Sequence, residues 1–400
     1  MRLIKLVSLS AYCRGRFAAK KFRFKGLSNN AGRLTIFCVV ILMSSEVCAD
    51  DSASTAPPQV NLWYGNYQTF GARGVPQQWV NILGNVTSPV GIAKLTYSLN
   101  GAPKVNMNWG PANPRLVEEG DFNADIDYSL LWPGSNRVII TATDYLNQST
   151  RQIVHIHNLG HHLASDVGHF TVDFRRVTNA TIQKWVQIVD GVWDIGIDGR
   201  IRTTQIGYDR AFVIGDTNIS GSYDIMTEFV LHGHPAGWAF GAASGWLGHT
   251  LDNYGEDDPS QPYIGHPFPA WGVIGPDNGG TDSYRIYTNL AVCAIAPPPG
   301  QNDCYETELS DNNTAPAPAL ETPYMYHYRV TVNSDGLTNH NSLNVWPKGT
   351  TEPTQWMVEA DTPAQAGAIL FDAHGVDVSI GPTITFIRPA WQRTNAIATR

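Results

Sequence analysis

Short runs of alternating apolar and polar residues dominate the chain. Ile92–Leu99, Arg137–Thr143 and Tyr324–Val332 repeat with a period of two, which is the period at which a β-strand turns side chains to opposite faces. Gly, Pro, Asn and Asp separate these runs, and no stretch has a sustained helical period. The pattern therefore predicts an all-β protein.

A dense series of such runs begins at Trp185–Asp216 and predicts a large antiparallel sandwich. Its opening strands are expected at Trp185–Val189, Arg200–Thr204 and Ala211–Ile214, between Asp-Gly and Gly-Tyr-Asp turns. Further strands are expected at Tyr223–His232, Trp238–Trp246, Ser283–Asn289, Tyr324–Val332, Ser342–Trp346, Gly367–Phe371 and Thr383–Ile387. Strands of this number and spacing suit a single large jelly roll.

An earlier and smaller unit precedes this series. Its strands are expected at Gln78–Gly84, Ile92–Leu99, Phe122–Ile126, Arg137–Thr143 and Gln152–His157. Asn100-Gly101 predicts a tight hairpin turn, because both residues tolerate positive φ. The size and rhythm of the unit are those of an immunoglobulin-like sandwich. We expect it to be dispensable for ligand binding.

Two resemblances support these expectations. Leu95–Gly101, Gly120–Asn123 and Asn136–Asp144 resemble segments of the Ig-like modules of exported bacterial proteins. The larger unit is similar to the concanavalin A-like (laminin G-like) domain, through Gly191–Trp193, Gly207–Arg210, Ser342–Pro347 and His374–Gly381. That superfamily includes lectins, carbohydrate-binding modules, glycoside hydrolases and polysaccharide lyases, so the resemblance implies a fold without fixing an activity.

The predicted organisation has six parts. They are a signal peptide at 1–49, a linker at 50–58, an Ig-like sandwich at 59–158, a His-rich linker at 159–171, a concanavalin A-like jelly roll at 172–389 and a C-terminal tail at 390–400. The histidines around the second linker have no acid or thiol at a ligand-like spacing, so a solvated linker is favoured over a zinc site.

The N-terminal segment indicates export. Basic residues precede the apolar run Leu34–Met43, and Val47-Cys48-Ala49 is typical of a cleavage site. The apolar run has about ten residues, too few to cross a bilayer. We therefore expect a secreted, periplasmic or cell-surface protein with no membrane span after cleavage. Cys293 and Cys304 would be its only cysteines, and export favours a disulfide between them.

Charge argues against two classes of partner. The chain has 27 basic and 35 acidic side chains, of which nine and one lie in residues 1–49. The remaining 18 basic and 34 acidic side chains give a net charge of −16, which repels nucleic acids and anionic membranes wherever no local basic surface exists.

Strand parity predicts which side chains leave the core. On each of four expected strands, alternate residues should face inward. They are Tyr326, Tyr328 and Val330; Tyr284 and Ile286; Leu343 and Val345; and Ile369, Phe371 and Ala373. If the opposite positions share one concave sheet, they form a surface suited to stacking on sugar rings and gripping hydroxyls or carboxylates. If they lie on a convex sheet, they form a solvated face. Some candidates also come from the aromatic-rich connection Gly233–Trp271. The candidate ligand-binding residues are Trp246, His249, Trp271, Arg285, Tyr287, Arg329, Trp346, Asp372 and His374.

Three classes of function remain open: polysaccharide binding, polysaccharide degradation on the same face, and adhesion or envelope scaffolding. Asp224-Ile-Met-Thr-Glu228 lacks the middle acid of a retaining glycosidase strand, so that pattern fails. A lyase would use a base beside a sugar carboxylate that is neutralised by a cation, with candidates His327, Arg329, Arg285, Tyr287 and His374.

No cofactor is required by any of these functions. The concanavalin A-like resemblance implies a structural calcium ion, for which Asp190 and Asp377 are the candidate ligands.

Overall fold

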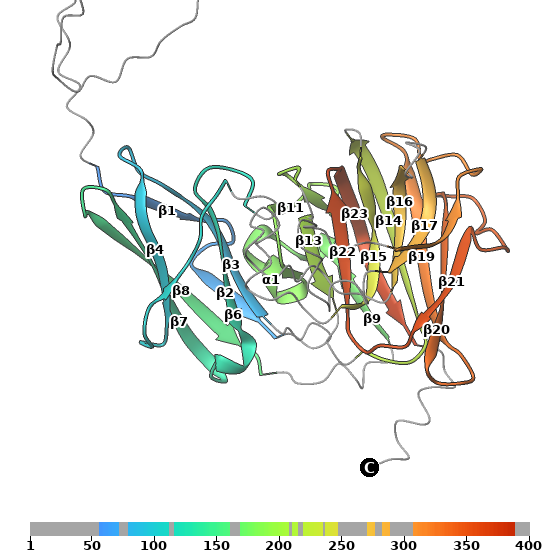
Figure 1. The fold of residues 1–400 in the computed structure, drawn as a ribbon, viewed down its shortest axis with the longest axis horizontal. Helices are drawn as coiled ribbons and strands as arrows, with labels where there is room; N and C mark the ends of the chain where they lie inside the picture. The colour runs from blue at the N-terminus through green and yellow to red at the C-terminus, as the bar shows by residue number, and fades with distance from the viewer. Residues whose placement is uncertain are drawn as a thin grey trace, which may run out of the picture. The chain divides into compact units, whose positions relative to one another are not determined.

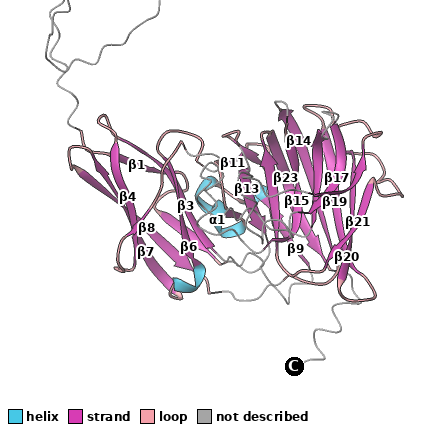
Figure 2. Ribbon diagram, in the orientation of Figure 1, coloured by secondary structure: helices cyan, strands magenta, loops and turns pink. Residues whose placement is uncertain are grey.

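The computed structural model describes residues 56–71, 79–111, 116–160, 169–207, 210–214, 219–234, 237–246, 270–276, 282–288 and 307–388. The regular secondary structure in this part of the chain is almost entirely β-strand, with one short α-helix, α1 (Ile182–Trp185), and single 3-10 turns at Tyr128–Leu130, Phe174–Arg176 and Asn179–Thr181 (Figure 2).

The first sandwich packs a three-stranded sheet against a five-stranded one. The smaller sheet has the order β1 (Gln59–Leu62), β3 (Trp79–Thr87), β6 (Asp121–Asp127). The larger has the order β2 (Tyr67–Phe70), β8 (Ser149–Asn158), β7 (Gly134–Asp144), β4 (Ile92–Leu99), β5 (Val105–Asn106). Asn100 and Gly101 form the predicted turn between β4 and β5, with φ of 49° and 83°.

The second sandwich begins with a seven-stranded sheet. Its order is β10 (Gln187–Ile188), β13 (Arg210–Ile214), β22 (Ala368–His374), β15 (Ala239–Trp246), β16 (Ala270–Pro276), β17 (Asp282–Thr288), β18 (Thr307–Asn312) (Figure 1). Its neighbouring strands are all antiparallel. Strand β22, from near the end of the described chain, therefore lies inside the sheet.

An eight-stranded sheet forms the other layer. Its order is β11 (Trp193–Ile195), β12 (Ile201–Thr203), β23 (Asp377–Ile387), β14 (Tyr223–Gly233), β19 (Pro323–Val332), β20 (Thr338–Pro347), β21 (Val358–Pro363), and β9 (His169–Asp173) also pairs with β23. Strand β23 is thus an interior strand that pairs with β9, β12 and β14.

The core lies between these two sheets. Phe212, Phe240 and Phe371 enter it from the seven-stranded sheet, and Tyr326 and Tyr328 enter it from the eight-stranded sheet. The Tyr326 hydroxyl donates to the Gly272 carbonyl at 2.6 Å and accepts from the Ala242 amide at 2.9 Å, which ties the layers together. A Cβ at Gly272 would come within 2.9 Å of the Tyr328 ring, so only glycine fits beneath the tyrosines.

The predicted fold class, an all-β chain with a smaller sandwich followed by a larger jelly-roll sandwich, is confirmed. Two local expectations were wrong. The run Trp185–Val189 is not one strand, because α1 ends at Trp185 before the two-residue β10. The predicted linker at 159–171 contains the start of β9, whose residues pair with β23.

The two sandwiches share buried polar contacts. Asn81 on β3, fully buried, accepts a hydrogen bond from the Gln187 amide at 2.6 Å, and its backbone carbonyl accepts one from Gln183 at 3.1 Å. Asn123 on β6 donates to the Val189 carbonyl at 2.7 Å. Tyr64 from the smaller sandwich also belongs to the core cluster of the larger one. The smaller sandwich is therefore more than a tethered spacer.

No helix in the described ranges is long and apolar enough to cross a membrane.

Candidate functional site

The predicted site residues divide between two faces of the jelly roll. Arg285 lies beside core residues of the seven-stranded sheet, whereas His327 and Arg329 lie beside core residues of the eight-stranded sheet. Because the core lies between the sheets, the two groups point away from each other on opposite outer faces. The predicted residues therefore do not form one constellation.

We call the outer side of the seven-stranded sheet the seven-strand face. Register places Asp372, Gly241, Val273 and Arg285 in one row across β22, β15, β16 and β17. Trp271 occupies the next row. Arg285 is 4% exposed and Asp372 is 7% exposed, and an Arg285 Nη1 atom lies 3.9 Å from a Glu308 carboxylate oxygen.

An apolar cluster occupies much of this face. Its buried cluster consists of Val189, Ala211, Val213, Ala243, Trp271, Val273, Ala368 and Leu370, which is separate from the core between the sheets. A guanidinium and a carboxylate are thus set among apolar side chains on the side of the sheet that does not face the core. Burying the charges of Arg285 and Asp372 costs free energy, so such groups are found in buried positions mainly where they are paired or have a function.

Three further predicted residues lie on strands of this sheet. His374 pairs with Ala239 at the end of β22, Tyr287 pairs with Trp271, and Trp246 pairs with Ala368. The side chains of Tyr287 and Trp246 are outside the described part. His249, Cys293 and Cys304 also lie outside the described residues, so the disulfide stays a prediction.

The outer side of the eight-stranded sheet, the eight-strand face, holds a compact ionic cluster. His327 lies between two carboxylates, with Nε2 2.9 Å from Asp224 Oδ1 and Nδ1 2.6 Å from Glu352 Oε1. The Arg329 Nε donates to Asp224 Oδ1 at 2.5 Å, and its guanidinium carbon lies 4.9 Å from the centroid of the Trp356 ring. Arg329 is therefore held by a salt bridge and a cation–π contact.

Electrostatics follow from this geometry. Burial raises the pKa of Asp224, but hydrogen bonds and charge from His327 and Arg329 outweigh it and hold the pKa below its ordinary value. Glu352 and Trp356 come from the segment between β20 and β21. The same segment covers Asn344, whose side-chain amide donates to the Pro353 carbonyl at 3.1 Å. Asn344 and Trp346 point away from the core, as predicted, yet both are buried, and this segment accounts for the burial of Asn344.

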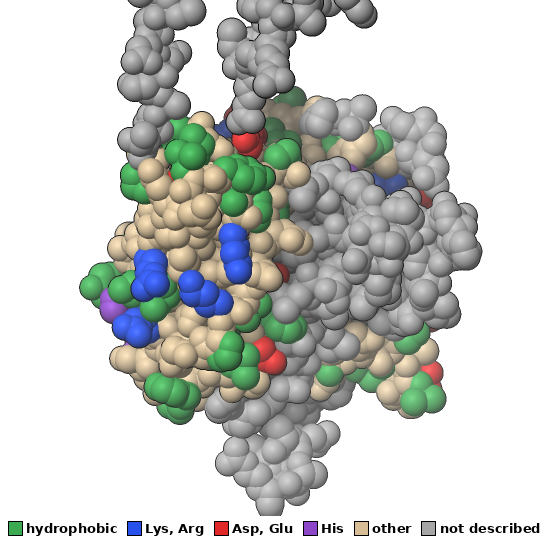
Figure 3. All heavy atoms as spheres, turned by 60° about the vertical axis from the view of Figure 1, so that its left-hand side comes forward, with side chains coloured by type: hydrophobic (Ala, Val, Ile, Leu, Met, Phe, Trp, Pro, Cys, Tyr) green, Lys and Arg blue, Asp and Glu red, His purple; other side chains and the backbone are tan. Residues whose placement is uncertain are grey.

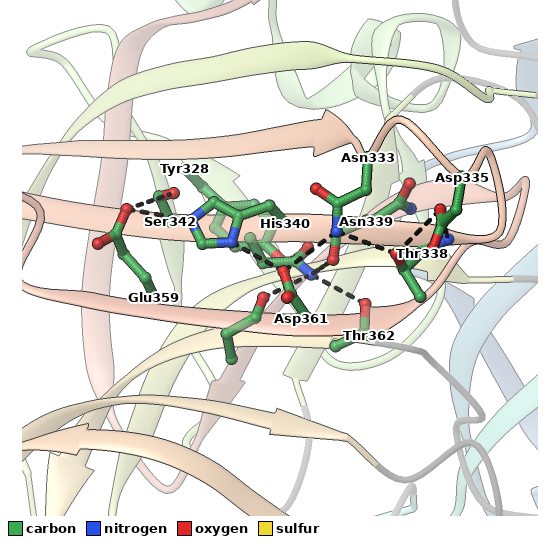
Figure 4. A network of polar contacts seen from close by, with 12 residues as sticks. Tyr328, Asn333, Asp335, Thr338, Asn339, His340, Ser342, Glu359, Asp361 and Thr362 are labelled. Carbon is green, nitrogen blue, oxygen red and sulfur yellow. Dashed lines mark hydrogen bonds and ion pairs between the residues drawn. The ribbon is translucent and has the colours of Figure 1, made fainter.

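A second polar network follows the edge of the same sheet (Figure 4). His340 Nδ1 lies 2.8 Å from Asp361, and its Nε2 lies 3.1 Å from Glu359. Asn333 donates to Thr338 at 2.9 Å and to Asp361 at 3.3 Å. Cross-strand pairs of this kind stabilise the β20–β21 edge.

The two carboxylates of the failed glycosidase pattern, Asp224 and Glu228, both lie on β14. Asp224 and Glu228 both point outward from β14, as parity predicts, with Met226 between them. Glu228 forms ion pairs with Arg200 and with Lys348, the latter at 2.5 Å. Both carboxylates are therefore engaged by cations.

The two candidate calcium ligands are also engaged by cations. Asp190 accepts hydrogen bonds from Arg210 at 3.3 Å and from the Gly191 amide at 2.7 Å. Asp377 forms a bidentate pair with Arg202 at 2.7 and 2.9 Å. The calcium site at these residues stays a prediction, and nowhere in the described ranges do three His, Cys, Asp or Glu side chains form a group that could hold a metal ion.

Comparison with known proteins finds no matching family model and no matching curated protein. Among solved structures, the exoplasmic/lumenal domain of VIP36 in its metal-free form is 12% identical, with a TM-score of 0.35 over 57% of this chain and 94% of that chain. The carbohydrate-binding module CBM66 from Bacillus subtilis is 10% identical, with a TM-score of 0.28 over 49% and 91%. The Lotus tetragonolobus seed lectin is 10% identical, with a TM-score of 0.28 over 49% and 90%. Function is therefore inferred from the side chains of this chain.

Proposed function

We propose that this protein binds a polysaccharide through the seven-strand face of its jelly roll. The observation that carries the proposal is the row containing Asp372 and Arg285, set in an apolar cluster beside Trp271, on the side of the sheet away from the core. A sugar offers an apolar ring face for an indole and hydroxyls or carboxylates for a guanidinium or a carboxylate. A few fixed polar groups on an apolar surface are typical of small-ligand sites.

Binding is favoured over cleavage. The lyase candidates lie on opposite faces, with His327 and Arg329 on one and Arg285 on the other. A base and a carboxylate clamp must meet at one sugar, and His327 is already held between Asp224 and Glu352.

We also propose that the smaller sandwich is immunoglobulin-like and that the protein is exported. The order β1-β3-β6 corresponds to strands A-B-E of that fold, and the order β8-β7-β4 corresponds to G-F-C. The signal-like pattern of residues 1–49 supports export.

Conservative substitutions test the proposed site. Arg285→Lys and Asp372→Asn keep side-chain size but remove the guanidinium fork or the negative charge. On a glycan panel, each is expected to lower affinity for the bound polysaccharide at least about tenfold, the loss for one charged hydrogen bond. Arg329→Lys on the opposite face is the matched control and should keep the affinity of the wild type.

Thermal melts would first establish that each variant is folded. Full affinity in folded Arg285→Lys and Asp372→Asn, or no polysaccharide bound by the wild type, would contradict the proposal. Ultraviolet absorbance of unsaturated sugars and reducing-end assays would detect cleavage, which is not expected.

A further inference from the structure

The outer side of the five-stranded sheet in the smaller sandwich carries a separate group of cations. Lys94 on β4, Arg137 on β7 and Arg151 on β8 are all exposed, and Lys104 stands just before β5. We call this surface the cationic face. Figure 3 shows Lys and Arg side chains gathered on this sandwich with few acidic ones among them.

Acidic residues are segregated from this face. On the five strands of the sheet the one acid is Asp144, which is fully buried and accepts hydrogen bonds from the amides of Leu146 and Gln148. The other acids described in this sandwich lie on β6 and the turn before it: Glu118, Glu119, Asp121, Asp125 and Asp127. In the described residues, no ion pair involves Lys94, Arg137 or Arg151.

An aromatic platform adjoins the cations. Tyr67 is 76% exposed and stacks on His155 with ring centroids 4.9 Å apart. Register places Tyr67, His155 and Arg137 side by side in one row across β2, β8 and β7. Ile153, 39% exposed, lies in the next row. Guanidinium, phenol and aliphatic groups thus share one exposed surface.

The spacing of the cations follows from the register. Arg151 lies one strand and two outward-facing rows from Arg137, so the two Cα atoms are about 14 Å apart at the usual rise and strand separation. By the same spacing, Lys94 is about 12 Å from Arg151. Duplex DNA presents a much denser array, with one phosphate per about 3.4 Å of helix axis on each strand. The cationic face therefore suits an extended acidic chain that it contacts at only a few, widely spaced charges.

We propose that the cationic face binds an anionic polysaccharide, at a site distinct from the seven-strand face. The sugar carboxylates or sulfates would pair with Arg137, Arg151 and Lys94, and a ring would stack on Tyr67. The net charge of −16 over residues 50–400 repels broad anionic surfaces such as membranes. A thin chain touching this face alone lies largely beyond that repulsion, because salt screens charges over about 8 Å at physiological ionic strength.

The test uses the full chain and polygalacturonate as the probe, in affinity electrophoresis across a salt series. The variant Arg137→Gln/Arg151→Gln is expected to bind at least about tenfold more weakly than the wild type and with a shallower salt dependence. Tyr67→Ala is expected to weaken binding severalfold while leaving the salt dependence unchanged. Arg176→Gln is the matched control: its side chain is 84% exposed, it lies in the jelly roll, and its binding should equal that of the wild type.

Further binding measurements distinguish this proposal from binding of neutral sugars, nucleic acids or membranes. Dextran should not bind through this face, and duplex DNA and phosphatidylserine vesicles should bind more weakly than polygalacturonate. The seven-strand site is tested separately on the glycan panel, and the readout here is the change in salt dependence in Arg137→Gln/Arg151→Gln, so failure of the seven-strand site would not imitate failure here. Wild-type affinity in Arg137→Gln/Arg151→Gln, or DNA or vesicle binding as tight as that of polygalacturonate, would overturn the inference.

Discussion

Asn81 offers a direct test of how the smaller sandwich supports the jelly roll. Its side-chain amide donates to Asn123 at 3.2 Å and to Asp125, and its carbonyl oxygen accepts from Gln187 at 2.6 Å. Asn81→Ala would leave the Gln187 amide and the Asn123 carbonyl without this partner inside a buried interface. Each such loss costs about 1–3 kcal/mol, so we expect the free energy of unfolding to fall by about 3 kcal/mol.

Urea unfolding, followed by hydrogen exchange in strands of both sandwiches, measures this effect. The wild type is expected to unfold in one cooperative transition, because its partners are shared across the interface. A double-mutant cycle with Gln187→Ala should give a coupling energy of about 1–3 kcal/mol. Thr69→Ala, on a partly exposed position of β2, is a control expected to stay within about 0.5 kcal/mol.

A fall of less than about 1 kcal/mol in Asn81→Ala would refute this reasoning, as would separate transitions in the wild type. Deleting the smaller sandwich would remove the partners of both Gln183 and Gln187. Whether that sandwich is dispensable for ligand binding therefore stays a prediction, better tested by substitution than by deletion.

Two further predictions concern protonation and covalent structure. Burial lowers the pKa of His340, but the hydrogen bonds that its ring donates to Asp361 and Glu359, together with their negative charge, outweigh it and raise the pKa above its ordinary value. The resulting stabilisation is present below the unfolded pKa of about 6.5 and is lost as pH rises through the folded pKa. Comparing urea stability of the wild type with His340→Gln should therefore show a larger deficit near about pH 6 than near about pH 9, and an equal deficit at both would count against it. Mass spectrometry of the unreduced protein should find Cys293 and Cys304 linked in one peptide; two alkylatable thiols would contradict the predicted disulfide.

Strand parity accounts for most of what the sequence could predict. Tyr326, Tyr328 and Val330 are in the core, and Arg329 on the same strand points outward, because period-two patterning fixes the side of a sheet on which each residue lies. The same rule placed Tyr284 and Ile286 correctly.

The grouping of site residues could not be predicted by that rule. Parity tells inward from outward but does not say which of two sheets a strand joins, so Arg285 and Arg329 looked equivalent. Contacts with residues from distant segments could not be predicted either. Glu352 contacts His327 and Trp356 contacts Arg329, and both come from a segment that has no strand pattern. On β3, Asn81 had the polar alternation of a solvent-facing position, yet it is fully buried.

Strands β22 and β23 have a consequence for how the chain is made. They hold interior places in the two opposing sheets, and they are the last strands in the described chain. Until residues 368–387 leave the ribosome, each sheet lacks a middle strand and the layers cannot close over one another. Distant pairings of this kind form late. Synthesis of these strands therefore precedes assembly of the larger sandwich, and until then the nascent chain exposes unpaired strand edges to the chaperones that it meets.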